Sequence, residues 1–158
     1  MNNFIPYDYN SIIPSNLSAK TIIMIGREDS IKRFNLGIEA MKYIVKEIPK
    51  CEMLIVINLK SHYLQKLTYK LNLNKNIKFL GYFLNPEKFY MNISLHIFPS
   101  LSEAFPNVLS ETLIYGIPTI LLGLDYLSLS KGGVIILYDD SPLSIAKIAI
   151  KIFFTFMN

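Results

Sequence analysis

Two glutamates in the stretch 98–116 are the side chains whose type and spacing most clearly suggest chemistry. Glu103 and Glu111 stand eight positions apart, with Pro106 and Gly116 where a short helix could begin and end. The pattern predicts an apolar strand, a loop that carries the first carboxylate and a helix that carries the second. Two carboxylates also invite comparison with the acid pair of a glycoside hydrolase, but that pair flanks a single scissile bond, and we do not assign this role to Glu103 and Glu111.

The composition predicts one domain with a sizeable core, because 51% of the 158 residues are hydrophobic. The net charge of +4 comes with scattered lysines, which suits anionic small molecules or the surface of a membrane and does not require nucleic acid. The apolar stretch 145–157 is shorter than the ~20 residues of a membrane span and carries Lys147 and Lys151. We expect it to form a buried or amphipathic helix. No signal peptide is recognisable, and we expect a cytoplasmic protein.

The cysteine and histidine content predicts no metal site. Cys51 is the single cysteine, which excludes an internal disulfide and makes a cysteine-built metal site a poor hypothesis, so we expect a structural role. His62 and His96 are too far apart for a metal-ligand spacing. His96 lies in an apolar run, where we expect a hydrogen-bonded core histidine, with a role in a site as the alternative. We expect neither a metal nor a cofactor.

Apolar runs alternate with helical patterns along most of the chain. Strands are expected at 21–25, 53–57, 77–82, 94–98, 119–122 and 134–138. Helices are expected at 31–48, 64–73, 106–115 and 141–154, with a short turn near Pro86. Continuous apolar strands separated by helices predict a doubly wound, Rossmann-like α/β domain with a parallel sheet. We assign residues 1–19 to a linker or connector arm and residues 20–158 to this domain. Ligands of such sheets bind beyond the carboxyl ends of the strands.

Short motifs at this predicted edge resemble those of a known enzyme family. In chain order they are Gly26-Arg27 with Lys32 five residues on, Gly81-Tyr82, Phe98-Pro99-Ser100, the run from Ser102 to Glu111, and Gly116-Ile117-Pro118. The stretch 21–152 resembles the C-terminal, nucleotide-sugar-binding domain of retaining glycosyltransferases of family 4, also called group 1, which have the GT-B fold. The resemblance implies one half of a GT-B enzyme that transfers a sugar from a UDP- or GDP-linked donor to an acceptor hydroxyl.

The resemblance gives roles to four charged residues. Arg27 and Lys32 would grip the diphosphate and stabilise the charge that grows on it as the glycosidic bond breaks. Glu103 would lie beside the donor sugar and Glu111 would accept hydrogen bonds from the ribose hydroxyls, so the two acids would hold opposite ends of one donor. The family needs no catalytic base in this domain. Without the resemblance, the cations could be solvated residues at a helix start, and the glutamates a loop cap and a helix-surface residue.

Further candidates, which would act mainly through backbone groups, complete the implied donor site. The turn before the predicted helix and the helix N-terminus would offer backbone N–H groups to phosphate or sugar oxygens. The glycine and tyrosine after the third strand would close around the base, or simply form a turn. These donor-binding candidates are Gly26, Gly81, Tyr82, Ser102, Ala104, Phe105, Pro106 and Asn107. The sequence departs from the family pattern at 58–60 and in the loop 124–133.

GT-B enzymes place the acceptor on a separate N-terminal domain, which this sequence does not supply. We therefore expect a missing acceptor domain as a partner and no sugar transfer by this chain alone, and the apolar end 153–157, if exposed, would favour a partner or aggregation. An alternative is a non-catalytic, degenerate GT-B half that acts as a binding or interaction module. A GT-B epimerase or a phosphorylase relative is a further alternative, because the fold is shared.

Overall fold

The computed structural model describes residues 14–58, 61–81, 89–101, 107–122 and 133–156. The strands are β1 (Thr21–Ile25), β2 (Glu52–Val56), β3 (Ile77–Leu80), β4 (Leu95–Phe98), β5 (Thr119–Leu122) and β6 (Val134–Leu137). The helices are α1 (Phe34–Glu47), α2 (His62–Lys70), α4 (Asn107–Ile114) and α5 (Pro142–Phe156), with 3₁₀ turns at Leu17–Ala19 and Ser30–Lys32. Each predicted strand and long helix is present. The turn expected near Pro86 lies outside the described residues.

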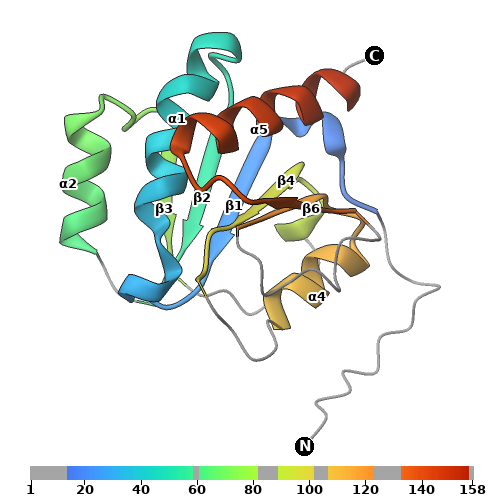
Figure 1. The fold of residues 1–158 in the computed structure, drawn as a ribbon, viewed down its shortest axis with the longest axis horizontal. Helices are drawn as coiled ribbons and strands as arrows, with labels where there is room; N and C mark the ends of the chain where they lie inside the picture. The colour runs from blue at the N-terminus through green and yellow to red at the C-terminus, as the bar shows by residue number, and fades with distance from the viewer. Residues whose placement is uncertain (1–13, 59–60, 82–88, 102–106, 123–132, 157–158) are drawn as a thin grey trace, which may run out of the picture.

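The six described strands form one parallel sheet in the order β3-β2-β1-β4-β5-β6 (Figure 1). The doubly wound sheet predicted from the apolar runs is confirmed. From β1 the chain winds outward to β3, then returns to pair β4 with the other side of β1, at the register Ile22 to Leu95. The carboxyl ends of β1 and β4 therefore flank the switch point, where such sheets bind their ligands.

The two faces of the sheet are covered by different helices. Ile22 and Met24 of β1 pack with residues of α1, α2 and α5, which lie together over one face in Figure 1. Ile23, which points to the opposite face, packs with Tyr90 and Tyr115. Because successive side chains of a strand alternate between faces, one five-residue apolar run supplies both layers of the core.

The start of α1 differs from the prediction, which began the helix at Ile31. The backbone amide of Lys32 donates to the Asp29 carboxylate at 3.0 Å, and this cap closes a separate 3₁₀ turn. Arg33 follows in the left-handed conformation with φ of 47°, so the α-helix begins one residue later, at Phe34. Ile31 is consequently 48% exposed rather than on the buried face.

Tyr69 lies on the outer side of α2 and is 73% exposed. The buried face of α2 carries Leu64 and Thr68. The Thr68 hydroxyl donates to the backbone carbonyl of Leu64 at 2.9 Å, which satisfies the hydroxyl inside the core. A polar residue therefore occupies the position four residues after Leu64, and the aromatic ring lies outside.

Two predicted helix ends are confirmed. Gly116 ends α4 with φ of +70°, and its amide donates to the Leu113 carbonyl at 3.0 Å, a left-handed termination that favours glycine. At the start of α5 the Ser141 hydroxyl accepts from the amide of Ser144 at 3.2 Å, as expected for a capping serine.

The described end of the proposed connector arm is hydrogen bonded to the domain. The amide of Ser15 donates to the Tyr115 carbonyl at 3.0 Å, and the amide of Asn16 donates to the Met91 carbonyl at 2.8 Å. The Ser94 hydroxyl donates to the carbonyl of Asn16 at 3.3 Å. These bonds attach residues 15 and 16 to the end of α4 and to the segment before β4.

Cys51 is fully buried, and burial raises the pKa of its thiol to about 12. Since the thiolate is the reactive form, we expect no iodoacetamide adduct on the native protein at pH 8 and complete labelling in urea, both measured by mass spectrometry. Rapid labelling of the native protein would contradict the structural role. Over the described part of the chain, no cluster of three or more His, Cys, Asp or Glu side chains could hold a metal ion.

Candidate functional site

The loops after β1 and β4 meet at the switch point of the sheet. The amide of Gly26, directly after β1, donates to the Val56 carbonyl at the end of β2, at 3.1 Å. The amide of Leu101, just after β4, donates to the Ile31 carbonyl at 3.0 Å. The 3₁₀ turn that carries Lys32 is thereby attached to the loop that leads toward Glu103.

Lys32 is held by packing of its stem and its ammonium group. A Cβ at position 26 would lie 3.3 Å from Lys32 Cε, so the glycine leaves room for the stem to pass. Lys32 Nζ lies 5.8 Å from the centroid of the Phe98 ring, at the end of β4. This is the geometry of a cation–π contact, and it places the ammonium between the ends of β1 and β4.

The electrostatics of Lys32 suit an anionic ligand. Burial lowers the pKa of its ammonium; the charge of Asp29 opposes this and the charge of Arg27 adds to it. Arg27, directly after Gly26, is exposed. Two cations that disfavour each other's charge are both stabilised when an anion binds between them. The structure therefore brings Gly26, Arg27 and Lys32 together at this edge of the sheet.

Arg33 is a residue that sequence reasoning missed. Its Nε donates to the Pro99 carbonyl at 2.7 Å, and its Nη1 pairs with Asp140 Oδ2 at 2.6 Å. One guanidinium thus joins the loops after β1, β4 and β6. From the sequence alone, Arg33 fits the polar side of the expected helix. In the structure its backbone is left-handed, and its side chain contacts Pro99 and Asp140 at the edge of the sheet.

The helix α4 begins at Asn107 on the same edge and carries Glu111 in its second turn. The free backbone amides of its first turn can receive oxygens of an anion. The Tyr90 hydroxyl donates to Glu111 Oε2 at 3.0 Å. The carboxylate of Glu111 is therefore held by a residue from the segment before β4.

His96 is confirmed as a hydrogen-bonded core residue. It is fully buried on β4, with Nδ1 at 3.1 Å from the Thr112 hydroxyl and 3.3 Å from the Thr119 hydroxyl. Since Thr112 donates to the Leu109 carbonyl, its oxygen is available to accept from Nδ1. Burial lowers the pKa of His96 to about 3, so the ring is neutral near pH 7. Its Nε2 has no partner among the residues that the structure describes.

The remaining predicted site residues are divided between described and undescribed segments. Gly81 follows β3 at the carboxyl edge of the sheet and is exposed, with open space where a Cβ would lie. The other candidates lie outside the described residues: Tyr82, Ser102, Glu103, Ala104, Phe105 and Pro106.

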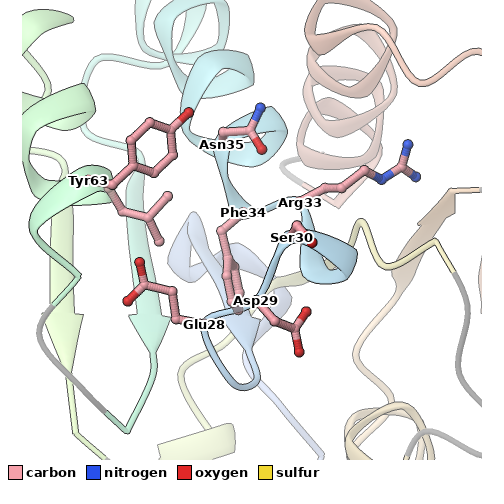
Figure 2. A pocket seen from close by; sticks show the side chains of 8 residues that line it. Glu28, Asp29, Ser30, Arg33, Phe34, Asn35 and Tyr63 are labelled. Carbon is pink, nitrogen blue, oxygen red and sulfur yellow. The ribbon is translucent and has the colours of Figure 1, made fainter.

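A pocket of about 390 Å³ lies between the loop after β1 and the starts of α1 and α2. Figure 2 shows Glu28, Asp29 and Tyr63 around it, with Arg33 pointing away from Tyr63. Glu28 accepts from the Ser61 hydroxyl, and Asp29 caps the 3₁₀ turn. Carboxylates that already serve the local fold repel phosphate, so this pocket is a poor place for a diphosphate, in contrast to the edge that carries Arg27.

The fold and this edge define a class: a Rossmann-like α/β domain whose ligand edge presents cations after β1 and a helix N-terminus after β4. Residues 9–123 match the family described as Glycosyl transferases group 1, and the chain belongs to that family. The group 1 assignment made from the short motifs is confirmed.

Two curated relatives are named as glycosyltransferases. An uncharacterized glycosyltransferase of Methanocaldococcus jannaschii is 35% identical over 100 residues, which are 62% of this chain and 24% of that protein. An uncharacterized glycosyltransferase of Haemophilus influenzae is 25% identical over 116 residues, 70% of this chain and 33% of that protein. The chain thus matches only about a quarter to a third of the length of these relatives.

Solved structures of glycosyltransferases share the fold of this chain. TarM superposes with a TM-score of 0.79 at 19% identity, over 92% of this chain and 30% of that one. Anabaena HepE in complex with UDP and glucose gives 0.75 at 17% identity, over 92% of this chain and 45% of its own. The pneumococcal O-GlcNAc transferase GtfA, in complex with UDP and GlcNAc, superposes with a TM-score of 0.74 at 20% identity, over 93% of this chain and 31% of that one. The sheet thus matches those of GT-B glycosyltransferases.

Proposed function

We propose that this domain binds the nucleotide diphosphate end of a sugar donor, as the C-terminal half of a retaining family 4 glycosyltransferase. The observation that carries the proposal is the position of Lys32, packed past Gly26 onto the Phe98 ring at the switch point, with Arg27 close enough to affect its charge. A diphosphate is the ligand whose charge best offsets two such cations. The UDP complexes of HepE and GtfA support a nucleotide of the same class.

In this proposal the residues at the edge act on different parts of the donor. Arg27 and Lys32 bind the diphosphate and stabilise it more strongly as it leaves, which lowers the barrier to transfer. Glu111 accepts hydrogen bonds from the ribose hydroxyls, and the segment at Gly81 lies against the base. We assign Glu103 to the donor sugar. No metal is required, because the two cations and the amides of α4 neutralise the phosphates.

The acceptor belongs to a second, N-terminal domain, with residues 1–19 as the connector. The match to only a quarter to a third of the relatives' length supports this division. We expect the chain alone to bind a nucleoside diphosphate and to transfer no sugar. A cytoplasmic location is part of the proposal, and the net charge of +4 suits contact with an anionic membrane surface.

Titration calorimetry with UDP and GDP tests the donor site. We expect one of the two to bind the native chain, and Lys32→Ala, Arg27→Ala and Glu111→Ala each to weaken that binding by about tenfold, because each removes a charge-assisted hydrogen bond. Lys42→Ala, which removes an exposed lysine of α1, is the matched control and should bind like the native chain.

Binding of neither nucleotide would favour the degenerate, non-catalytic interaction module. Equal weakening by Lys42→Ala and Lys32→Ala would show that only net charge matters. Measurable turnover of a nucleotide sugar by the chain alone would contradict the division between a donor and an acceptor domain.

A further inference from the structure

The Tyr90 hydroxyl donates a hydrogen bond to Glu111 Oε2 at 3.0 Å, across 21 positions of sequence. Tyr90 is only 2% exposed. Its ring is stacked on Tyr115, with centroids 5.0 Å apart and planes at 30°, and Phe89 lies edge-on at 5.8 Å. A ring packed on two sides cannot swing away, so the phenol oxygen is a fixed donor.

The environment of the ring fixes it further. Tyr90 belongs to the core cluster on the α4 face of the sheet, together with Ile23, Val56 and Ile117. Glu111 is only half-buried and lies on a helix surface, where a glutamate has several staggered rotamers of comparable energy. A hydrogen bond from an immobile donor selects one of these rotamers.

We propose that Tyr90 is a positioning residue that presets Glu111 to accept the ribose hydroxyls of the nucleotide and so sets the preference for ribonucleotides. The inference rests on the proposed function, since it assigns Glu111 to the ribose. A carboxylate offers about four lone-pair positions, and the bond to Tyr90 occupies one of them. The group retains acceptor capacity for a diol, and the loss of side-chain entropy on binding is reduced because the rotamer is already chosen.

A purely structural role for the same bond makes a different prediction. If the Glu111 carboxylate served only to satisfy a buried phenol, losing the hydroxyl would loosen the site in general. Affinity would then fall equally for nucleotides with and without ribose hydroxyls. A positioning role lowers affinity only where a hydroxyl is present to be bound.

The test compares UDP with 2′,3′-dideoxy-UDP in calorimetric titrations of the native chain and Tyr90→Phe, with the guanosine pair used if the native chain prefers GDP. Phenylalanine keeps the ring and its stacking and removes the donor. We expect about three- to tenfold weaker binding of UDP, the range for the net loss of one ordinary hydrogen bond, because Tyr90 acts on the nucleotide only through Glu111, and unchanged binding of the dideoxy nucleotide. Tyr43→Phe, on α1, is the control for loss of a hydroxyl elsewhere and should change neither affinity.

Two further variants test whether Tyr90 acts through Glu111, and the second of them does not contain Tyr90→Phe. In the Glu111→Ala background, Tyr90→Phe should cause no additional loss, because the tyrosine acts through the carboxylate. Glu111→Asp leaves Tyr90 intact and withdraws the carboxylate from it, and should show the same loss of preference for UDP over its dideoxy analogue.

The outcomes separate this inference from the proposed function. If the native chain binds neither UDP nor GDP, the proposed function is wrong and the inference falls with it. If UDP binds but Tyr90→Phe weakens both nucleotides equally, or weakens neither, the donor site stands and the positioning role of Tyr90 is overturned.

Discussion

Lowering the pH from 7 to 5 is expected to reduce the free energy of unfolding by about 2 kcal/mol through His96 alone. Burial in the folded protein lowers the pKa of His96 to about 3, whereas the unfolded chain has the ordinary histidine value of about 6.5. Between these values the unfolded state binds a proton that the folded state does not. The stabilisation that comes from keeping His96 neutral is therefore complete above the pKa of the unfolded chain, and it is lost progressively as the pH falls toward the pKa of the folded protein.

Urea unfolding of the native chain and of His96→Gln at both pH values measures this effect. Glutamine cannot titrate and can still bond to the hydroxyls of Thr112 and Thr119. The two proteins need not be equally stable at pH 7. On going from pH 7 to pH 5, we expect the free energy of unfolding of His96→Gln to fall by about 2 kcal/mol less than that of the native chain. His62→Gln, at an exposed position on α2, is the control and should keep the native pH dependence. Identical losses in the native chain and His96→Gln would show that His96 is not buried neutral.

Replacing Arg33 by alanine is expected to lower the free energy of unfolding by about 2 to 3 kcal/mol, because it removes a charge-assisted bond and leaves the buried Pro99 carbonyl unsatisfied. The same change removes one of the bonds between the loops after β1 and β4 and leaves the bond of the Leu101 amide to the Ile31 carbonyl. We therefore expect UDP binding to weaken as well, even though Arg33 is not assigned a contact with the nucleotide. Chemical unfolding and calorimetry measure the two effects.

Asp140→Asn separates the two partners of Arg33. Asp140 is 63% exposed, and exposed ion pairs contribute only about 0 to 1 kcal/mol. We expect Asp140→Asn to cost less than about 1 kcal/mol and to leave nucleotide binding almost unchanged. If both variants have the same small effect, Arg33 is a surface ion pair rather than a tie between loops.

The sheet could be predicted because each strand is a short apolar run bounded by turn residues. The run 119–122 coincides with β5 (Thr119–Leu122), and the run 21–25 coincides with β1 (Thr21–Ile25). The start of α1 could not be predicted from periodicity, because Ile31 and Phe34 also fit a helix. The Asp29 cap and the left-handed backbone at Arg33 override that pattern locally.

The candidate site was predictable where it follows from strand order and not where it depends on pairs of distant side chains. Gly26 and Lys32 could be placed because loops after parallel strands meet at one edge. The bond of Tyr90 to Glu111 and the contact of Arg33 with Pro99 join residues 21 and 66 positions apart. Neither pair leaves a local pattern in the sequence.

The attachment of residues 15 and 16 has a mechanical consequence. Ser15 is bonded to the carbonyl of Tyr115, and Asn16 to the carbonyl of Met91, the neighbour of Tyr90. The two hydrogen bonds thus hold the backbone at and beside the two stacked rings, Tyr115 and Tyr90. A displacement of Ser15 would therefore be passed, through the Tyr115 carbonyl, to the aromatic stack whose Tyr90 hydroxyl holds Glu111.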